Sequence, residues 1–396
     1  MRRMGQANPT GELDAALQWL LGQAPEMERA LGALVDQNSH TDNRAGADRV
    51  AAMLRELFTL PGLTAEPHPS DRFGEHLVVS SSSAGSGDVL LIGHHDTVFP
   101  VGTFEGVRED GELLRGPGVL DMKGGLVVIR FALAALARAG LLGRIPLRVV
   151  SVADEEVGSP TSQPLLRALC EHAACALVFE SGRQNDAIVT TRKATGGAIV
   201  TARGKAAHAG ARHDEGKNAI WALARFIDRA QRLTDYPRGV TINVGKIEGG
   251  LGKNTVPELA RAQLDLRFSA PTDGAYVLEA LAEAARAAAA EVPGTTVEVA
   301  AEVTRQPMRK TAASAALLDE YAACARAAGL GAAEAPPSGG GSDANTVSAL
   351  GLPAIDALGP RGTGFHTRDE HIVRATLVPK AEALVRFLAG RAARSA

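Results

Sequence analysis

Short apolar runs alternate with helical patterns through the first half of the chain, and this alternation constrains the fold most. The runs at 89–92, 147–152 and 177–179 have the length of buried strands. A helical pattern that begins near Gly125 separates the first two runs. Such an order predicts βαβ units, in which parallel strands pair and helices cover the sheet. We therefore expect an α/β fold with a mixed, mainly parallel sheet and flanking helices.

A different pattern interrupts this one between residues 194 and 306. It reads strand, helix, strand, strand, helix, strand, which is the order of a ferredoxin-like α+β unit. The α/β pattern then resumes and includes an apolar run at 354–358. We predict a first domain segment at 1–193, an inserted domain at 194–306, and a second segment of the first domain at 307–396.

Composition excludes several classes of protein. The 42 lysines and arginines against 45 aspartates and glutamates leave a net charge of −3, which disfavours a nucleic-acid binder. The three cysteines form no CxxC pair, so a reducing compartment fits and a cysteine-bound metal does not. No apolar run approaches the roughly 18 residues of a membrane span. We expect a cytoplasmic protein with no membrane partner.

Polar residues gather where the apolar runs stop. In open α/β sheets, ligands bind beyond the carboxyl ends of the strands, so these residues are expected at one edge of one sheet. They include histidines and several carboxylates from five segments of the chain. The residues are His94, His95, Asp96, Asp121, Asp154, Glu155, Glu156, Glu180 and His366.

This combination of residue types indicates a metal site. Several carboxylates at close range repel one another, and divalent cations relieve that repulsion. Two histidines and three carboxylates, one of them bridging, suit a pair of Zn²⁺ ions that share a water molecule. Each motif alone has an ordinary explanation, since a single His-x-Asp or an acidic turn is usually structural. A dehydrogenase is disfavoured because no GxGxxG motif follows the first strand.

Three motifs, at 93–98, 116–125 and 154–159, resemble the N-terminal signatures of the di-zinc aminoacylase/carboxypeptidase superfamily of metallopeptidases. That superfamily includes glutamate carboxypeptidases of the G type, acetylornithine deacetylases, succinyl-diaminopimelate desuccinylases and tripeptide aminopeptidases. The resemblance continues in order through 204–210, 243–257 and 340–343. It therefore covers nearly the whole chain, and it is closest to the glutamate carboxypeptidase branch.

The resemblance implies a role for each motif residue. Two Zn²⁺ ions per subunit, with Co²⁺ or Mn²⁺ as alternatives, would be bound by five ligands. These ligands are His94, Asp121, Glu156, Glu180 and His366. Asp121 would bridge the ions, Asp96 would orient His94, and Glu155 would be the general base that takes a proton from the attacking water.

Two further histidines are not predicted to bind metal. His95 occupies a variable position between the ligand and the aspartate, and His371 matches no ligand position of the superfamily. The sequence also departs from the superfamily after Glu180, where Ser181 stands in place of the common proline. Arg183 follows shortly after and is a candidate specificity residue.

The inserted domain resembles the lid and dimerisation domain of the superfamily. The resemblance implies that His208 reaches the active site of a partner subunit and stabilises the oxyanion, which predicts a homodimer. Asn254 and Arg267 match positions that hold the substrate's terminal carboxylate, although Arg267 could instead pair structurally with Asp265. Gly341 lies in a glycine-rich segment and is interpreted as a close backbone approach to the substrate.

These features predict an enzyme that cleaves an amide bond. The expected substrate is an N-acyl amino acid or short peptide with a free carboxylate, and the favoured reaction is release of a C-terminal acidic amino acid. The alternative enzyme is an N-acyl-amino-acid deacylase of the acetylornithine deacetylase or aminoacylase type. A non-catalytic metal-binding or ligand-binding protein on the same scaffold is a third possibility, which the intact Glu155 disfavours.

Overall fold

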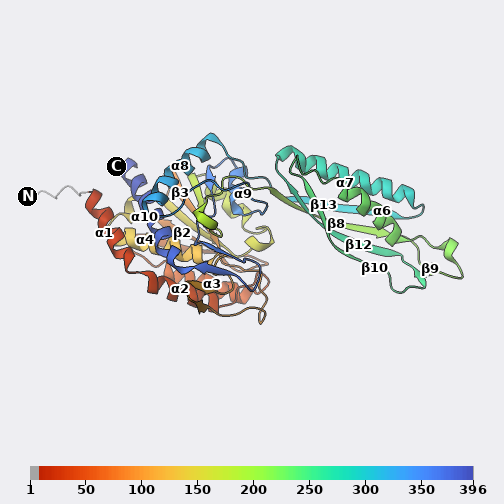
Figure 1. Ribbon diagram of the computed structural model, residues 1–396, viewed down its shortest axis with the longest axis horizontal. Helices are drawn as coiled ribbons and strands as arrows, with labels where there is room; N and C mark the ends of the chain where they lie inside the picture. The colour runs from red at the N-terminus through yellow and green to blue at the C-terminus, as the bar shows by residue number, and fades with distance from the viewer. Residues whose placement is uncertain (1–8, 396) are drawn as a thin grey trace, which may run out of the picture. The chain divides into compact units, whose positions relative to one another are not determined.

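The computed structural model describes residues 9–395 and divides the chain into two units (Figure 1). Unit 1 comprises Met1–Thr190, Arg309–Pro337 and Ser342–Ala396, and unit 2 comprises Thr191–Met308 and Ser338–Gly341. Residues 1–8 and 396 of the expected domain segments lie outside the described residues. The segment at 338–341 belongs to unit 2, although its glycine-rich sequence offers no apolar pattern that assigns it there.

Unit 1 contains a six-stranded mixed sheet with flanking helices. Its strand order is β1-β2-β6-β3-β7-β14, in which β6, β3, β7 and β14 pair in parallel and β1 and β2 join antiparallel at one edge. The expected α/β fold with a mainly parallel sheet is therefore confirmed. The strands are β1 (Leu63–His68), β2 (His76–Ser81), β3 (Asp88–His94), β6 (Leu147–Val152), β7 (Ala173–Val178) and β14 (Ala354–Ile355).

The helices of unit 1 bury the apolar residues of this sheet. Helix α4 is buried along nearly its whole length and packs against β3, α1, α2 and α10. One hydrophobic core joins these helices to the strands, and it includes Leu91, Ile129 and Leu384. The helices are α1 (Pro9–Leu21), α2 (Ala24–Asp36), α3 (Arg44–Leu57), α4 (Lys123–Arg138), α5 (Gln163–Cys170), α8 (Ala312–Ala327), α9 (Asp343–Ala349) and α10 (Leu377–Ser395).

Unit 1 also contains a second, small sheet of four strands. Its order is β15-β16-β5-β4, and all its pairings are antiparallel. It places the chain before Asp121 beside the chain that carries His366, because β5 pairs with β16. Its strands are β4 (Arg108–Asp110), β5 (Leu113–Arg115), β15 (Gly362–Thr363) and β16 (His371–Val373).

Unit 2 is the ferredoxin-like insertion. Its antiparallel sheet has the order β10-β12-β8-β13, and α6 and α7 pack on the sheet and on each other around a separate hydrophobic core (Figure 1). A short pair, β9 with β11, stands apart from this sheet. The elements are β8 (Ala194–Arg203), β9 (Ala207–His208), α6 (Ala219–Gln231), β10 (Thr241–Gly249), β11 (Thr255–Val256), β12 (Leu259–Phe268), α7 (Pro271–Glu291) and β13 (Thr296–Arg305).

One expected strand is much shorter in the structure. The apolar run at 354–358 forms a strand only at Ala354–Ile355. Ala357 has a φ of 66°, in the left-handed region, so the chain turns out of the sheet there. Apolar character alone does not report such a turn.

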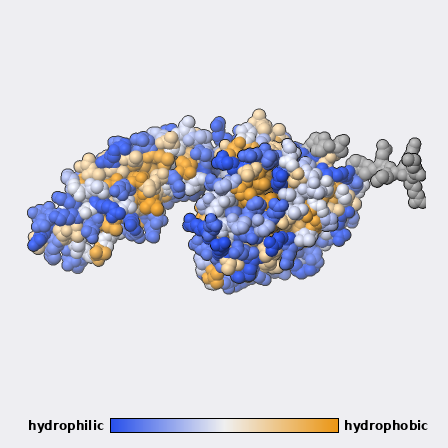
Figure 2. Space-filling view, turned by 180° about the vertical axis from the view of Figure 1, so that it is seen from behind, coloured by the Kyte–Doolittle hydropathy of each residue, from blue (hydrophilic) through white to orange (hydrophobic). Residues whose placement is uncertain are grey.

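Hydrophobic and hydrophilic residues are interspersed on the surface of both units. On the face drawn in Figure 2, hydrophobic patches lie among hydrophilic side chains on the larger and the smaller unit. Across residues 9–395, no helix combines the length and hydrophobicity that crossing a membrane requires.

Candidate metal centre

The candidate ligands lie where strands of unit 1 end, so the sheet itself brings them together. His94 is the last residue of β3, and Glu180 follows shortly after β7. Glu155 and Glu156 open a short 3-10 helix, η2 (Glu155–Val157), after β6. Because β6, β3 and β7 are parallel neighbours, their carboxyl ends meet at one edge of the sheet.

Asp121 lies between the two histidines of the site. Its Oδ1 is 3.3 Å from Nε2 of His94, and its Oδ2 is 3.4 Å from Nε2 of His366. Nε2 of His94 is also 3.7 Å from Oε1 of Glu180, and Nε2 of His366 is 3.1 Å from Oε2 of Glu156. Asp121 therefore joins two donor groups, His94 with Glu180 and His366 with Glu156.

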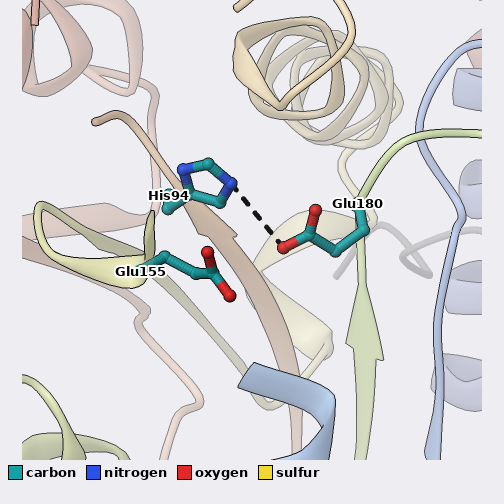
Figure 3. Close-up of side chains that lie close together, drawn as sticks. All are labelled: His94, Glu155 and Glu180. Carbon is teal, nitrogen blue, oxygen red and sulfur yellow. Dashed lines mark ion pairs between the residues drawn. The ribbon is translucent and has the colours of Figure 1, made fainter. Parts of the chain in front are cut away.

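Glu155 points into the same space as His94 and Glu180 (Figure 3). One ligand atom from each of these three residues lies within 4.8 Å of the other two, and the same is true of His94, Asp121 and Glu156. The two adjacent glutamates thus diverge, since Glu156 approaches His366. This divergence is what separate roles, as a metal ligand and as a base, require.

Asp96 holds three parts of the site at once. Its Oδ1 is 3.3 Å from Nδ1 of His94 and accepts a hydrogen bond from the backbone amide of Glu155 at 3.2 Å. Its Oδ2 accepts from the backbone amide of Glu156 at 3.2 Å and from the hydroxyl of Thr41 at 2.8 Å. The side chain is fully buried. A single carboxylate therefore orients one imidazole and the turn that bears both glutamates.

The crowded carboxylates shift one another's pKa. Burial and the charge of Asp121 raise the pKa of Glu156 to about 8 and that of Glu180 to about 7. Hydrogen bonds to Asp121 and Glu156 raise the pKa of His366 to about 10. Burial alone would lower the pKa of His94, but Glu180, Asp121 and Asp96 raise it well above its usual value. If every carboxylate were ionised, the group would carry more negative charge than its two imidazoles could neutralise, and the raised pKa values of Glu156 and Glu180 reflect burial together with that repulsion.

The donor set fits a pair of divalent cations. It offers imidazole nitrogen and carboxylate oxygen, the ligands that Zn²⁺ and similar ions take in hydrolases. Oε1 of Glu156 is buried and has no hydrogen-bond partner among residues 9–395, so this oxygen has an unused capacity to accept a bond. A cation at this position would satisfy that oxygen and favour the ionised form of the neighbouring carboxylates.

Three residues near the site are not among these donors. His95 is fully buried, its Nδ1 is 2.9 Å from the hydroxyl of Ser151, and burial lowers its pKa to about 3. His371 lies in β16, where its Nδ1 is 2.7 Å from the backbone oxygen of Asp369. The guanidinium of Arg183 lies 6.0 Å from the ring centroid of Phe365. Phe365 in turn packs edge-on against His366, so Arg183 lies at the margin of the site.

The remaining predicted residues all belong to unit 2. Nδ1 of His208 accepts backbone hydrogen bonds from Gly210 and Ala211, and the backbone oxygen of Asn254 accepts one from Ala209. His208 and Asn254 thus share one corner of that unit.

Arg267 and Gly341 have well-defined surroundings within unit 2. The guanidinium of Arg267 donates two hydrogen bonds to Asp265, at 2.8 and 2.7 Å, which is the structural pairing considered above. A Cβ on Gly341 would come within 2.7 Å of a methyl group of Thr195, so only glycine fits there without a shift. This close approach involves the protein's own chain.

Sequence reasoning missed three residues that make hydrogen bonds close to the ligands. Thr41 and Glu370 hydrogen-bond to Asp96 and to the Asp121 backbone, respectively. The buried ammonium of Lys123 donates to the backbone oxygens of Leu34 and Gln37. Only Glu370 had a signal in the sequence, its place four residues after His366; the contacts of the other two depend on the fold.

Comparison with known proteins supports the same chemistry. The sequence model of Peptidase family M20/M25/M40 matches residues 90–390. The chain is 28% identical over 367 residues to carboxypeptidase G2 from Pseudomonas sp. (strain RS-16), covering 90% of this chain and 87% of that protein. It is 33% identical over 207 residues to acetylornithine deacetylase from Myxococcus xanthus, covering 48% of this chain and 52% of that protein.

Solved structures show the same fold. The M20 family metallo-carboxypeptidase Sso-CP2 from Sulfolobus solfataricus superposes with a TM-score of 0.75 at 19% identity. The match covers 92% of this chain and 98% of that one. The architecture of both units is therefore shared across a wide range of sequences.

Proposed function

Because the chain belongs to peptidase family M20/M25/M40, we propose that this metallopeptidase uses two zinc ions to hydrolyse an amide bond beside a free carboxylate. The observation that carries the proposal is the position of Asp121, whose two oxygens face His94 and His366 at 3.3 and 3.4 Å. A carboxylate so placed can bridge two cations. Cobalt and manganese remain alternatives that the donor set also accepts.

The side chains of unit 1 divide the work of hydrolysis. Zinc ions, when bound, polarise the substrate carbonyl and make the attacking water more acidic. Glu155 accepts the proton of that water and delivers it to the leaving amine. Asp96 holds His94 and the turn that bears Glu155 in fixed positions relative to each other during the reaction. A non-catalytic binding protein is disfavoured, since such a protein has no need of Glu155 beside His94 and Glu180.

We propose that the preferred reaction is release of a C-terminal acidic amino acid. The similarity to carboxypeptidase G2 along most of both chains supports this choice, as does the resemblance of Asn254 and Arg267 to carboxylate-binding positions. A deacylase is the alternative, supported by the similarity to acetylornithine deacetylase over about half of each chain. The two reactions differ in which side of the amide carries the recognised group.

A substrate panel distinguishes the two reactions. The zinc-loaded protein is given N-acyl-glutamates, N-acetylornithine and N-acetyl derivatives of neutral amino acids, and the released amine is measured together with bound metal by mass spectrometry. The proposal expects kcat/KM for N-acyl-glutamates at least about tenfold above the others, as one well-placed charged contact provides. Preference for N-acetylornithine would establish the deacylase, and absence of bound metal would overturn both.

We further propose that the protein is a homodimer formed through unit 2, with His208 serving the partner's active site. Large exposed hydrophobic residues support this interface, since among the described residues seven of eleven lie in unit 2. They are Ile199, Ile220, Trp221, Tyr236, Ile247, Leu251 and Tyr276. Exposed apolar side chains mark an association site where they form one contiguous patch.

A further inference from the structure

Glu370 is a buried carboxylate that none of the roles above uses. Its side chain is fully buried, and it lies between His366 and strand β16. Oε1 accepts a hydrogen bond from the backbone amide of Leu120 at 2.9 Å and a second from that of Asp121 at 3.0 Å. One oxygen atom thus holds two consecutive amides of the segment that leads into α4.

The backbone of Glu370 makes a further connection between the same two segments. Its carbonyl oxygen accepts a hydrogen bond from the amide of Gly116 at 3.3 Å, and its amide donates to the carbonyl oxygen of Thr367 at 3.2 Å. The first bond extends the pairing of β16 with β5, and the second closes the turn that follows His366. Glu370 is therefore fixed both to the Asp121 segment and to the His366 segment.

These contacts bear on the one carboxylate that faces both histidines. Asp121 can lie between His94 and His366 only if its backbone is held at a fixed distance from the chain that carries His366. No regular strand pairing reaches Asp121 itself, since β5 ends at Arg115. Without the Glu370 side chain, the two buried amides of Leu120 and Asp121 would lose their acceptor.

We propose that Glu370 is a positioning residue of the metal centre: its Oε1 fixes the Asp121 backbone relative to His366 and so sets the geometry of the ion that these two residues share. The inference rests on the proposed metal centre. The positioning role depends only on the hydrogen bonds that Oε1 accepts, because Oε2 has no hydrogen-bond partner among residues 9–395. A glutamine at position 370, which keeps one carbonyl oxygen, should therefore accept the same two hydrogen bonds and preserve metal affinity.

The test compares three variants for metal binding. Glu370→Gln keeps the acceptor, Glu370→Leu removes it at similar volume, and Asp88→Leu is the control. Asp88 is also buried and accepts a backbone amide, from Gly85, but it lies at the opposite end of β3 from His94. Affinities for both ions are measured by competition with a chromophoric chelator, and the visible spectrum of the Co²⁺ form reports the ligand geometry.

We expect Glu370→Leu to weaken the more weakly held ion by about 10–100-fold and to change the Co²⁺ spectrum, as loss of supporting hydrogen bonds does at metal sites. Glu370→Gln should stay within about threefold of wild type, and Asp88→Leu should lose stability without altering affinity. Wild-type affinities and spectrum in Glu370→Leu would overturn the inference, as would equal losses in the glutamine variant.

Two outcomes need separate treatment. If Glu370→Leu does not fold, Glu370→Asp takes its place, because its carboxylate is one methylene shorter and withdraws from the two amides; wild-type metal affinity in that variant would overturn the inference. If the wild-type protein binds no metal, the proposed function itself fails. A wild-type protein that binds two ions, with Glu370→Leu unchanged, contradicts only the role of Glu370.

Discussion

At the scale of single residues, the centre depends on carboxylates that differ in what each one touches. Asp121 faces two imidazoles, Asp96 faces one imidazole, one hydroxyl and two backbone amides, and Glu370 accepts hydrogen bonds from backbone amides. Glu155 has an acidic neighbour in Glu156; both come near His94, but only Glu156 also contacts His366, at 3.1 Å. The same functional group therefore serves as bridge, support and candidate base according to its surroundings.

Replacing Glu155 by glutamine separates chemistry from metal binding. The amide keeps the size of the side chain but cannot accept a proton, so kcat should fall by about 10²–10⁴-fold, the usual contribution of a general base. Bound metal, measured by mass spectrometry, should remain at the wild-type level because Glu155 is not among the predicted ligands. Unchanged kcat would remove Glu155 from the mechanism, and loss of an ion would make it a ligand.

The residues that meet in the centre were named from the sequence partly through local motifs and, for Glu180 and His366, through the resemblance to the superfamily. His94 and Asp96 are two positions apart, and Glu155 and Glu156 are adjacent, so short stretches of sequence carry the pattern. The supporting contacts were not predictable, since Thr41 reaches Asp96 and Glu370 reaches Asp121 across long stretches of chain. Such contacts depend on how loops pack, which apolar periodicity does not encode.

At the scale of elements, strand β3 has a buried carboxylate near each end, and the two carboxylates have different roles. Asp88, at its start, pairs with Arg148, and Asp96, just past its end, supports the metal centre. Both carboxylates are buried, but only one lies beside predicted ligands. The strand between them carries Leu91 and Ile92 into the core.

Matched substitutions at the two ends of β3 should have different effects. Asp96→Asn should weaken metal affinity by about 10–100-fold, because the amide nitrogen cannot accept from the backbone amides of Glu155 or Glu156. Asp88→Asn should lower stability and leave metal affinity unchanged. Chelator competition and urea unfolding measure the two quantities. Equal metal affinity in both variants would show that Asp96 does not support the site.

An ion cluster around the buried carboxylate of Asp186 connects two further elements of unit 1 with the chain that precedes β15. Asp186, in the 3-10 helix η3 (Gln184–Asp186), pairs with Arg361 and lies 3.5 Å from the ammonium of Lys380 in α10. Burial alone would raise the pKa of Asp186, but its hydrogen bond to Arg361 and the charge of Lys380 hold it below its usual value. The ionised form is therefore favoured in the folded protein.

Asp186→Asn should lower the free energy of unfolding by about 3–5 kcal/mol at neutral pH, because two cations lose their buried partner. The pKa of Asp186 is lower in the folded state than in the unfolded one. Its stabilisation is thus fully present above the unfolded value and is lost as pH falls through the folded value. The difference between wild type and variant should narrow as pH falls below about 4.

Urea unfolding between pH 7 and pH 3.5 measures that difference. The control is Asp110→Asn, which removes an exposed pair with Arg115 and should change stability by less than about 1 kcal/mol. A stability gap between wild type and Asp186→Asn that stays constant or widens on acidification would contradict the assignment.

The elements that could be predicted from sequence are those with strong periodicity. The apolar strands β3, β6 and β7 and the alternating strands of unit 2 follow the expected order. Strands β1 and β2 were not predicted. Strand β1 contains Glu66 and Pro67, and its apolar residues do not form a run, whereas the apolar run of β2 spans only residues 77–79. The small sheet was missed because its strands are only two or three residues long.

At the scale of the whole molecule, the two units have separate cores and hold different candidate residues. Every predicted metal ligand belongs to unit 1, whereas His208, Asn254 and Arg267 belong to unit 2. The proposed reaction uses both sets. This division makes the oligomeric state a question about catalysis as well as assembly.

Mixing two inactive variants tests the proposed exchange of His208 between subunits. His208→Ala and Glu155→Gln should each be nearly inactive alone. Random exchange makes about half of the dimers mixed, and one of the two sites in each mixed dimer has both residues if His208 acts on its partner. Activity should recover to about one quarter of wild type. No recovery, with exchange verified by native mass spectrometry, would assign His208 to its own subunit.

The short segment Ser338–Gly341 returns to unit 2 after the chain has already left it. There the carbonyl oxygen of Ser338 accepts the amide of Lys193, and its amide donates to the carbonyl oxygen of Thr191. A gene fragment that encodes only 191–308 would omit these bonds. Exchange of one continuous gene segment between homologous genes therefore cannot transfer the whole smaller unit. Such an exchange must also include the glycine-rich segment at 338–341.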